Sequence, residues 1–330
     1  MGIGCLMDRK KQFVNMLCVG DSIDDVFVLA EKSLGRKKNG DSFLSFGFAD
    51  RTGDIKGVAW DNVEEINGAA ASGAFVRVTG AVSEFRGGLQ LTVRGLVCCD
   101  TDTVDPADFL PVTTRNPDRM FDRLKRTVDE CIRDPHIKRL MEAFWADEAF
   151  VRRFKTAPAA KKMHHAYIGG LLEHTLSMTV LAKEIAKHYS GVNLDLLLAG
   201  AVLHDIGKTR EFEYQFAIGY SDEGKLLTHI VIGCAMIDDK IRELAGFPPE
   251  TAMLVKHMVV SHHGSREFGS PEPPKLMEAV LLNQIDDIDA KMNGIREFMA
   301  GEDPNETWTS YNRMLGRQLY RGKPPEEPSE

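Results

Sequence analysis

The stretch LLLAGAVLHDIGKTR, Leu196 to Arg210, decides how the second half of this chain is interpreted. It is apolar as far as Leu203, and it then places His204 and Asp205 side by side before a glycine. Burying an imidazole and a carboxylate without partners costs several kcal/mol, roughly. We therefore expect either a hydrogen-bond network or a metal ion to hold both side chains.

The composition is that of a globular protein with more than one core. The chain has 330 residues, of which 43% are hydrophobic, which is enough for two ordinary domains. Its formal net charge of -8 excludes a strongly basic protein that coats nucleic acid, although local basic patches remain compatible with it.

The cysteines and the N-terminal residues bear on the compartment. The six cysteines form no CxxC pair and no regular framework, so we expect a reducing compartment, no structural disulfides and no zinc finger. The N-terminal residues have no apolar signal core, and no stretch approaches the ~18 uncharged apolar residues of a membrane span. The sequence predicts a cytoplasmic protein that does not enter a membrane.

Short alternating runs dominate residues 20–100 and predict about five β-strands. The runs are DVFVLAEKSL, DSFLSFGFAD, IKGVAW, AFVRVTGAVSEF and LQLTVRGLV. A longer excursion, NVEEINGAAASG, separates the third run from the fourth. Five strands with one long, helical insertion fit an OB-type β-barrel, whereas the rival β-sandwich usually needs about seven strands. We assign residues 1–105 to this barrel, as an OB-fold nucleic-acid-binding domain.

From Asp105 onward, apolar and charged residues mix at helical spacing, so an all-helical remainder is predicted. We expect a helical connector at 106–160 and an all-α domain at 161–300. Residues 301–330 form a C-terminal segment whose ending, GKPPEEPSE, has the composition of a disordered tail. The predicted fold class is thus multidomain β + α, a five-stranded barrel followed by a helical domain.

Nine of the ten histidines fall between His164 and His263, and several lie on apolar helix faces. In GGLLEHTLSMTVLAKEIAKHY, His174 shares a face with Leu171 and Met178. His204 ends the next apolar stripe, and PKLMEAVLLNQIDDIDAKM carries Asp286 on a third, with Asp287 and Asp289 nearby. Three helices therefore direct polar side chains inward.

Taken alone, His174 is better explained as a hydrogen-bonded core histidine than as a metal ligand. Imidazoles and carboxylates projected from several helices into one interior favour a metal centre, with manganese, iron or zinc as suitable ions. His229, His262 and His263 allow a second ion, and Asp205 is the natural bridge. Two ions can polarise a phosphoryl group and activate water for in-line attack, with Lys208 available to bind the substrate phosphate.

The order His174, His204-Asp205, Asp286 resembles the HD superfamily of metal-dependent phosphohydrolases. The longer motifs are more specific: PAAKKMHHAYIGGLLEHTL, AVLHDIGKTREF, SHHG and LLNQIDDIDAKM follow NGDSFLSFGFADRTGDIKGVAWDN. Together they resemble the YhaM-type 3'-5' exoribonucleases, which join an N-terminal OB domain to an HD domain. The resemblance covers roughly residues 15 to 315.

The resemblance implies two groups of metal ligands. The first group would be His174, His204, Asp205 and Asp286, and the second would be Asp205, His229 and His262, with His263 as a ligand or a neighbour of one. Asp205 and Lys208 would be the catalytic residues. The family usually has a histidine where this chain has Asn283, which puts the role of that position in doubt. His164 and His165 precede the His174 helix, and either substrate contact or a capping or core role fits them.

An OB barrel binds single strands through a groove that follows the phosphates and aromatic faces that stack on bases. The candidate nucleic-acid-binding residues lie on turns and outward strand faces: Lys37, Lys38, Arg51, Arg77, Arg86 and Arg94. Each of them, taken singly, is better explained as a solubilising charge. We expect Phe46, Phe48, Phe85 and Trp60 to be core residues rather than stacking platforms.

The resulting functional hypothesis is a cytoplasmic, metal-dependent 3'-5' exoribonuclease, a phosphodiesterase that releases nucleoside 5'-monophosphates from single-stranded RNA. Manganese is the family expectation, and iron, cobalt and zinc remain compatible with the ligands. Two alternatives stay open: an HD phosphodiesterase that acts on nucleotides or cyclic dinucleotides, and a single-strand DNA-binding accessory factor. Activity on single-stranded DNA and assembly into homo-oligomers are also left open.

Overall fold

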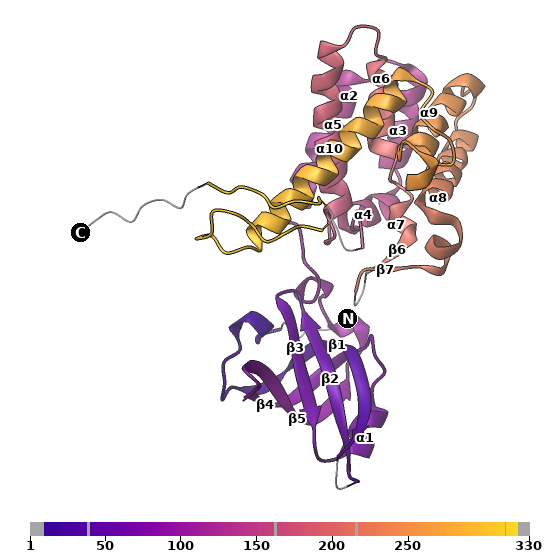
Figure 1. Ribbon diagram of the computed structural model, residues 1–330. Coiled ribbons are helices and arrows are strands. Elements are labelled where there is room, and N and C mark those ends of the chain that lie inside the picture. The colour runs from indigo at the N-terminus through magenta and orange to yellow at the C-terminus, as the bar shows by residue number, and fades with distance from the viewer. Residues whose placement is uncertain (1–9, 38–39, 162–163, 215–216, 314, 323–330) are drawn as a thin grey trace. The chain divides into compact units, whose positions relative to one another are not determined.

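The structure is a computed structural model that describes residues 10–37, 40–161, 164–214, 217–313 and 315–322. The chain divides into two compact units, one made of 1–114 with 212–221 and the other of 115–211 with 222–330. Figure 1 shows that the first is built mainly of strands and the second mainly of helices. The predicted combination of a β-barrel and a helical domain is confirmed, whereas the boundaries predicted at 105, 160 and 300 stay predictions.

Five strands close into a barrel in the order β1-β2-β3-β5-β4, with β4 returning to β1. Their bounds are β1 Ser22–Arg36, β2 Ser42–Asp50, β3 Gly53–Ala59, β4 Phe75–Phe85 and β5 Gly88–Cys98. All neighbouring pairs are antiparallel except β3 with β5. Each of the five predicted runs forms one strand, and the insertion forms the short helix α1, Val63–Ala69.

Two irregularities let a small sheet curve enough to close. The pairing of β1 with β2 skips Ala30, between Leu29 and Glu31, and the pairing of β4 with β5 skips Arg94, where Thr79 and Gly80 pair with Gly95 and Val93. A β-bulge bends its strand in this way. A Cβ at Gly80 would lie 2.2 Å from the carbonyl oxygen of Thr92, so only glycine allows this close approach. The interior is then filled by side chains such as Phe27 and Phe48, which are fully buried.

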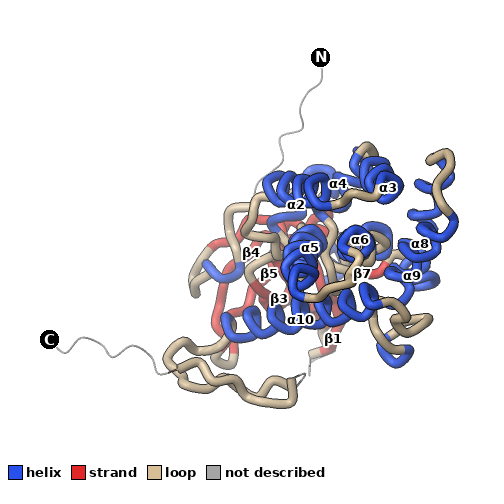
Figure 2. Tube along the Cα trace, turned by 90° about the horizontal axis from the view of Figure 1, so that it is seen from above, coloured by secondary structure: helices blue, strands red, loops and turns tan. Residues whose placement is uncertain are grey.

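The second unit consists of helices that pack against one another. In chain order they are α2 Pro117–Cys131, α3 Pro135–Trp145, α4 Glu148–Thr156, α5 Gly170–His188, α6 Leu194–Leu203, α7 Lys208–Glu211, α8 Asp222–Glu243, α9 Pro249–Ser261 and α10 Met277–Ala300. Figure 2 shows α2, α3 and α4 along one side of α5 and α6, with α10 on the other side. All residues from Leu196 to Leu203 are buried, as expected for a helix that is apolar all round.

The prediction that everything after Asp105 is helical is wrong at one place. Phe212–Glu213 (β6) and Gly219–Tyr220 (β7) pair as a short antiparallel hairpin. The aromatic and small residues between α7 and α8 do not repeat apolar side chains at helical spacing. Hydrogen bonds between β6 and β7 satisfy their backbone groups instead. Among the described residues, no helix combines the length and the apolar character that a membrane crossing needs. The predicted tail at 323–330 lies outside the described residues.

Candidate metal centre

His174 and His204 meet in the interior with their Nε2 atoms 3.2 Å apart. Each ring binds an oxygen through its other nitrogen: Nδ1 of His174 lies 2.8 Å from Asp289, and Nδ1 of His204 lies 3.1 Å from the carbonyl oxygen of Ala201. A carbonyl or carboxylate oxygen can only accept, so Nδ1 carries the proton and Nε2 of a neutral ring carries a lone pair. Two lone pairs thus face each other, and a cation or a proton is needed between them.

Two carboxylates lie beside this histidine pair. Oδ1 of Asp286 is 3.4 Å from Nε2 of His174, and Oδ2 of Asp205 is 3.4 Å from Nε2 of His204. Ligand atoms about 2.1 Å from one ion lie about 3.0 to 3.5 Å from each other. The four side chains therefore fit a single ion, and Figure 1 shows that α5, α6 and α10, which carry or adjoin them, are neighbours.

A second group of nitrogens faces the other oxygen of Asp205. Nε2 of His229 and Nε2 of His262 each lie 3.6 Å from Oδ1 of Asp205. All three atoms are buried without a hydrogen-bond partner among the described residues. Nδ1 of His262 donates to the carbonyl oxygen of Val259, so its Nε2 also carries a lone pair. Orphaned buried polar atoms of this kind are costly, and a shared cation would satisfy all of them.

The two groups of candidate ligands differ in how readily their histidines take up a proton, as His204 and His262 show. Burial lowers the pKa of His204, but the neighbouring Asp205 raises it more, so this ring can take up a proton. Burial, with His204 as the next contribution, holds the pKa of His262 well below its ordinary value. His262 therefore stays neutral, which is the form of an imidazole that ligates metals.

His263 completes the second group from the mouth of the site. A ring nitrogen of His263 lies within 4.8 Å of ligand-type atoms of His229 and His262. Its Nδ1 donates 2.8 Å to the carbonyl oxygen of Phe268, which leaves its Nε2 free to bind an ion. The structure thus brings all seven predicted metal residues into one region of the second unit.

Lys208 lies inside the site rather than in solvent. Its Nζ is 2.6 Å from Oδ2 of Asp205, and its side chain is mostly buried. Burial opposes a charge on Asp205, but Lys208 and His204 together hold its pKa well below the usual range. Lys208 therefore keeps Asp205 ionised, and its role as a phosphate-binding residue stays a prediction.

The sequence analysis gave Asp289 no role and did not name Glu211, and both residues orient candidate ligands. Asp289 accepts hydrogen bonds from His174, from Nε2 of His165 at 3.0 Å and from the hydroxyl of Ser177. Burial would raise its pKa, but these hydrogen bonds lower it. Carboxylates that bind the second nitrogen of a ligating histidine fix its orientation. The sequence placed Asp289 near Asp286 on the same predicted helix, but nothing in it named the partners of Asp289.

Glu211 plays the same part for His229. Its Oε1 accepts from the backbone N–H of His229 at 2.9 Å and from Nδ1 of the ring at 3.1 Å. The ring is presented at a kink in α8, where Thr228 has a left-handed φ of 62°. A Cβ at Gly207 would lie 2.0 Å from the carbonyl oxygen of His229, so the glycine after His204-Asp205 allows the kink to approach closely.

Two of the remaining positions, His165 and Asn283, make defined hydrogen bonds. His165 is buried and hydrogen-bonded to Asp289 and Tyr167, which is the core role. Burial lowers the pKa of His164 to about 4, and Lys208 contributes in the same direction. Asn283 donates from Nδ2 to the carbonyl oxygen of His262 at 2.7 Å, so it braces the backbone of a candidate ligand.

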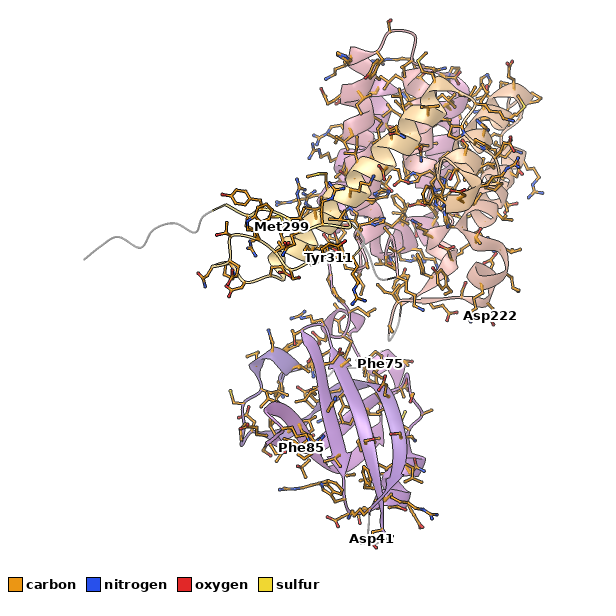
Figure 3. All side chains as sticks on the ribbon, viewed as in Figure 1. Asp41, Phe75, Phe85, Asp222, Met299 and Tyr311 are labelled. Atoms are coloured by element: carbon orange, nitrogen blue, oxygen red, sulfur yellow. The ribbon has the colours of Figure 1, made fainter. Side chains whose placement is uncertain are left out.

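On the barrel, two aromatic residues expected in the core are exposed, and that expectation is wrong for both. Trp60 is 45% exposed and Phe85 is 56% exposed, because Trp60 follows the last residue of β3 and Phe85 is the last residue of β4, where the barrel interior no longer covers them. Lys37 lies 4.9 Å above the ring of Trp60, and Arg86 lies 5.2 Å from that of Phe85. Figure 3 shows Phe85 at the edge of the barrel. Phe46 and Phe48 are buried as expected.

The other predicted basic residues differ in their surroundings. Arg51 binds Asp108 at 3.8 Å and lies over the ring of Phe13, so it braces the barrel. Arg77 pairs with Asp24 at 3.0 Å, and Arg94 is exposed. Lys38 lies outside the described residues.

Comparison with known proteins agrees with both units. Residues 29–97 match an OB-fold nucleic acid binding domain, and residues 171–291 match the HD domain. The chain is thus a protein with an OB-fold barrel and an HD domain.

Two curated relatives match the chain over nearly its whole length. The 3'-5' exoribonuclease YhaM of Geobacillus sp. (strain WCH70) is 34% identical over 304 residues, 92% of this chain and 93% of the relative. That of Bacillus subtilis (strain 168) is 33% identical over 304 residues, 92% of this chain and 96% of the relative. The chain belongs to the YhaM family of 3'-5' exoribonucleases.

Proposed function

We propose that this protein is a metal-dependent 3'-5' exoribonuclease that shortens single-stranded RNA. The proposal depends on one observation: the two carboxylate oxygens of Asp205 face two different groups of candidate ligands. Its Oδ2 lies against His204 and its Oδ1 against His229 and His262, so one carboxylate bridges two positions suited to cations. The names of the relatives supply the substrate class, and the OB barrel is a suitable holder of a single strand.

In this proposal, His174, His204, Asp205 and Asp286 hold one ion, and Asp205, His229, His262 and His263 hold the other. Divalent ions there would polarise the scissile phosphoryl group and lower the pKa of a water for in-line attack. Manganese is the proposed ion, because mixed imidazole and carboxylate ligands suit it, and iron, cobalt and zinc suit the same donors. The chain prepares three of these ligands: Asp289 and Glu211 orient the imidazoles of His174 and His229, and Lys208 holds Asp205 ionised.

A long strand is favoured over a small nucleotide as substrate. The barrel exposes Trp60 and Phe85, each with a basic side chain beside it, and a base stacks well on such a pair. A phosphodiesterase for cyclic dinucleotides would have no use for this surface. The same surface would serve an accessory factor that only binds single-stranded DNA, but such a factor would not need the buried ligand groups.

The test is to incubate the protein, stripped of metal and reloaded with manganese, with 5'-labelled single strands of RNA and DNA. We expect a ladder of shortening products that starts from the 3' end of RNA, with nucleoside 5'-monophosphates released. Reloading with iron, cobalt or zinc ranks the metals. Intact RNA with every metal would refute the proposal, and cleavage of cyclic dinucleotides alone would support the alternative phosphodiesterase.

A further inference from the structure

The residues that follow α10 form a compact arm rather than a plain tail. Backbone hydrogen bonds join Thr309 to Leu319 at 2.9 Å and Arg321 to Thr307 at 2.8 Å, and Asn312 and Arg317 bond to each other in both directions. The turn is closed by Leu315, whose N–H donates to Oδ1 of Asn312. We call residues 307–313 and 315–322 the C-terminal arm. Figure 1 shows it in yellow at the end of α10.

The base of this arm is fixed to the end of α10. Glu302 accepts from the backbone N–H of Ser310 at 2.6 Å and from its hydroxyl at 2.8 Å. The side chain of Arg321 donates to the carbonyl oxygen of Asp303 at 3.0 Å. Thr309 is buried and binds the backbone of Leu319 through its hydroxyl. The arm is therefore held in a defined position on the second unit.

The arm presents aromatic rings to solvent although it is well ordered by hydrogen bonds. Trp308 is 54% exposed, Tyr311 is 61% exposed and Tyr320 is 57% exposed. The rings of Trp308 and Tyr320 lie 5.0 Å apart across the two halves of the arm. Figure 3 labels Tyr311 on this segment. Exposed aromatic residues grouped in this way mark binding sites, because nothing in the fold is gained by leaving them in water.

The charge of the arm differs from that of the whole chain. Residues 307–322 contain Arg313, Arg317 and Arg321 and no acidic residue, in a protein with a net charge of -8. Arg313 and Arg317 are exposed at the turn, and the nearest acidic residue in sequence, Glu306, precedes the arm. Guanidinium groups interleaved with exposed rings match a single-stranded nucleic acid, which offers phosphates and base faces alternately.

We propose that the C-terminal arm is a second binding site for the RNA strand, separate from the barrel. This inference rests on the proposed function in one respect only, that the bound strand is RNA. α10 carries Asp286 and continues without a break to Ala300, fourteen residues further on. At about 1.5 Å per residue the end of α10, to which the base of the arm is fixed, lies about 21 Å from Asp286. That distance corresponds to about six nucleotides of a stacked strand at about 3.4 Å each, so only longer RNAs reach the arm from the metal centre.

The first test replaces the two exposed arginines, as Arg313→Gln with Arg317→Gln, in the full-length metal-loaded protein. For an RNA of about 20 nucleotides we expect KM to rise at least about fivefold with kcat unchanged, and the salt dependence of binding to flatten by about 1.4 in log-log slope, which is two phosphate contacts. An RNA of about four nucleotides, too short to reach the arm, should change less than about twofold. The matched control is Lys187→Gln with Lys225→Gln, since both lysines are already paired with carboxylates on their own helices.

A second variant tests stacking without touching the arginines. Tyr311→Ala should weaken binding of the long RNA in fluorescence anisotropy at least about fivefold, and Tyr311→Phe should restore it, because the ring and not the hydroxyl makes the contact. Tyr189→Ala removes an equally exposed ring at the end of α5 and should have no effect.

The outcomes separate this inference from the proposed function. If the unmodified protein shortens RNA and the arm variants bind long RNA as it does, the arm is not an RNA site. If the variants change the molar mass in light scattering and leave RNA affinity intact, the arm is a contact between copies of this chain and the proposal is wrong. If no RNA is shortened but the arginine variant still loses affinity for long RNA, the arm proposal stands and the exoribonuclease proposal fails.

Discussion

The metal centre and the exposed surface of the barrel use polar and aromatic side chains in opposite ways. At the metal centre, His174, Asp205 and Asp289 are buried and come from α5, from the turn between α6 and α7, and from α10. They belong to one contact network, in which His174 lies against both carboxylates. On the barrel, Trp60 with Lys37 and Phe85 with Arg86 form two small groups with exposed rings, one after β3 and one at the end of β4. Coupled residues in one network are strongly non-additive, whereas separate exposed contacts add nearly independently. A single substitution at the metal centre should therefore abolish most of the RNA shortening, whereas each substitution on the barrel should lower the RNA affinity by a small separate factor.

The largest expected effect follows from Asp205→Ala. It removes both oxygens that face the two histidine groups, so RNA shortening should fall by more than about 1,000-fold, beyond the 10- to 100-fold typical of residues around the ligands. Anisotropy should show unchanged affinity for a single strand, because the barrel is untouched. Asp287→Ala, an exposed neighbour of Asp286, is the control. Hydrolysis that survives the loss of Asp205 would contradict the two-ion assignment.

A smaller effect is expected from Asp289→Asn. The amide cannot accept from His174, His165 and Ser177 as the carboxylate does, so His174 loses its fixed orientation. We expect the metal affinity to fall by about 10- to 100-fold. Titration of metal-free protein, followed by calorimetry, measures this directly, and excess metal should restore most of the RNA shortening. Equal affinity in both proteins would mean that Asp289 does not position the ligand.

Trp60→Ala and Phe85→Ala test the other side of the comparison. Stacking of a base on an aromatic ring contributes about 1 kcal/mol or more, so each variant should lose at least about fivefold in affinity for single-stranded RNA. The double variant should lose the product of the two factors, because the rings are separate. Hydrolysis of a dinucleotide should not change. A double variant no weaker than either single one would show that the two groups act as one site.

The smallest effect is expected from single arginines of the barrel. Arg94→Gln should flatten the dependence of log affinity on log salt by about 0.7, one phosphate contact on a single strand. Arg77→Gln should flatten it less, because Arg77 already pairs with Asp24 at 3.0 Å. Binding isotherms at several salt concentrations measure both slopes. Equal slopes for the two variants would mean that the ion pair to Asp24 opens when the strand binds.

Local patterns in the sequence determined the elements and the faces that they bury. Alternation in β4 and β5 and the three- and four-residue spacing around His174 and His204 depend only on neighbours in the chain, which is why these predictions are confirmed. Nine of the ten histidines lie in the helical half, and several apolar helix faces end in polar residues. These two features were enough to select the seven candidate ligands, which the structure brings into one region.

Tertiary structure alone decided which side chains meet and which remain exposed. Asp289 reaches His174 from 115 residues away, and Glu211 reaches His229 across a kink at Thr228. Trp60 and Phe85 have the composition of core residues, yet they lie where the barrel ends. Periodicity in the sequence predicts which face of a helix or strand is buried. It does not predict which residue on the facing element is the partner, or where the core ends, because both depend on how segments distant in the sequence pack together.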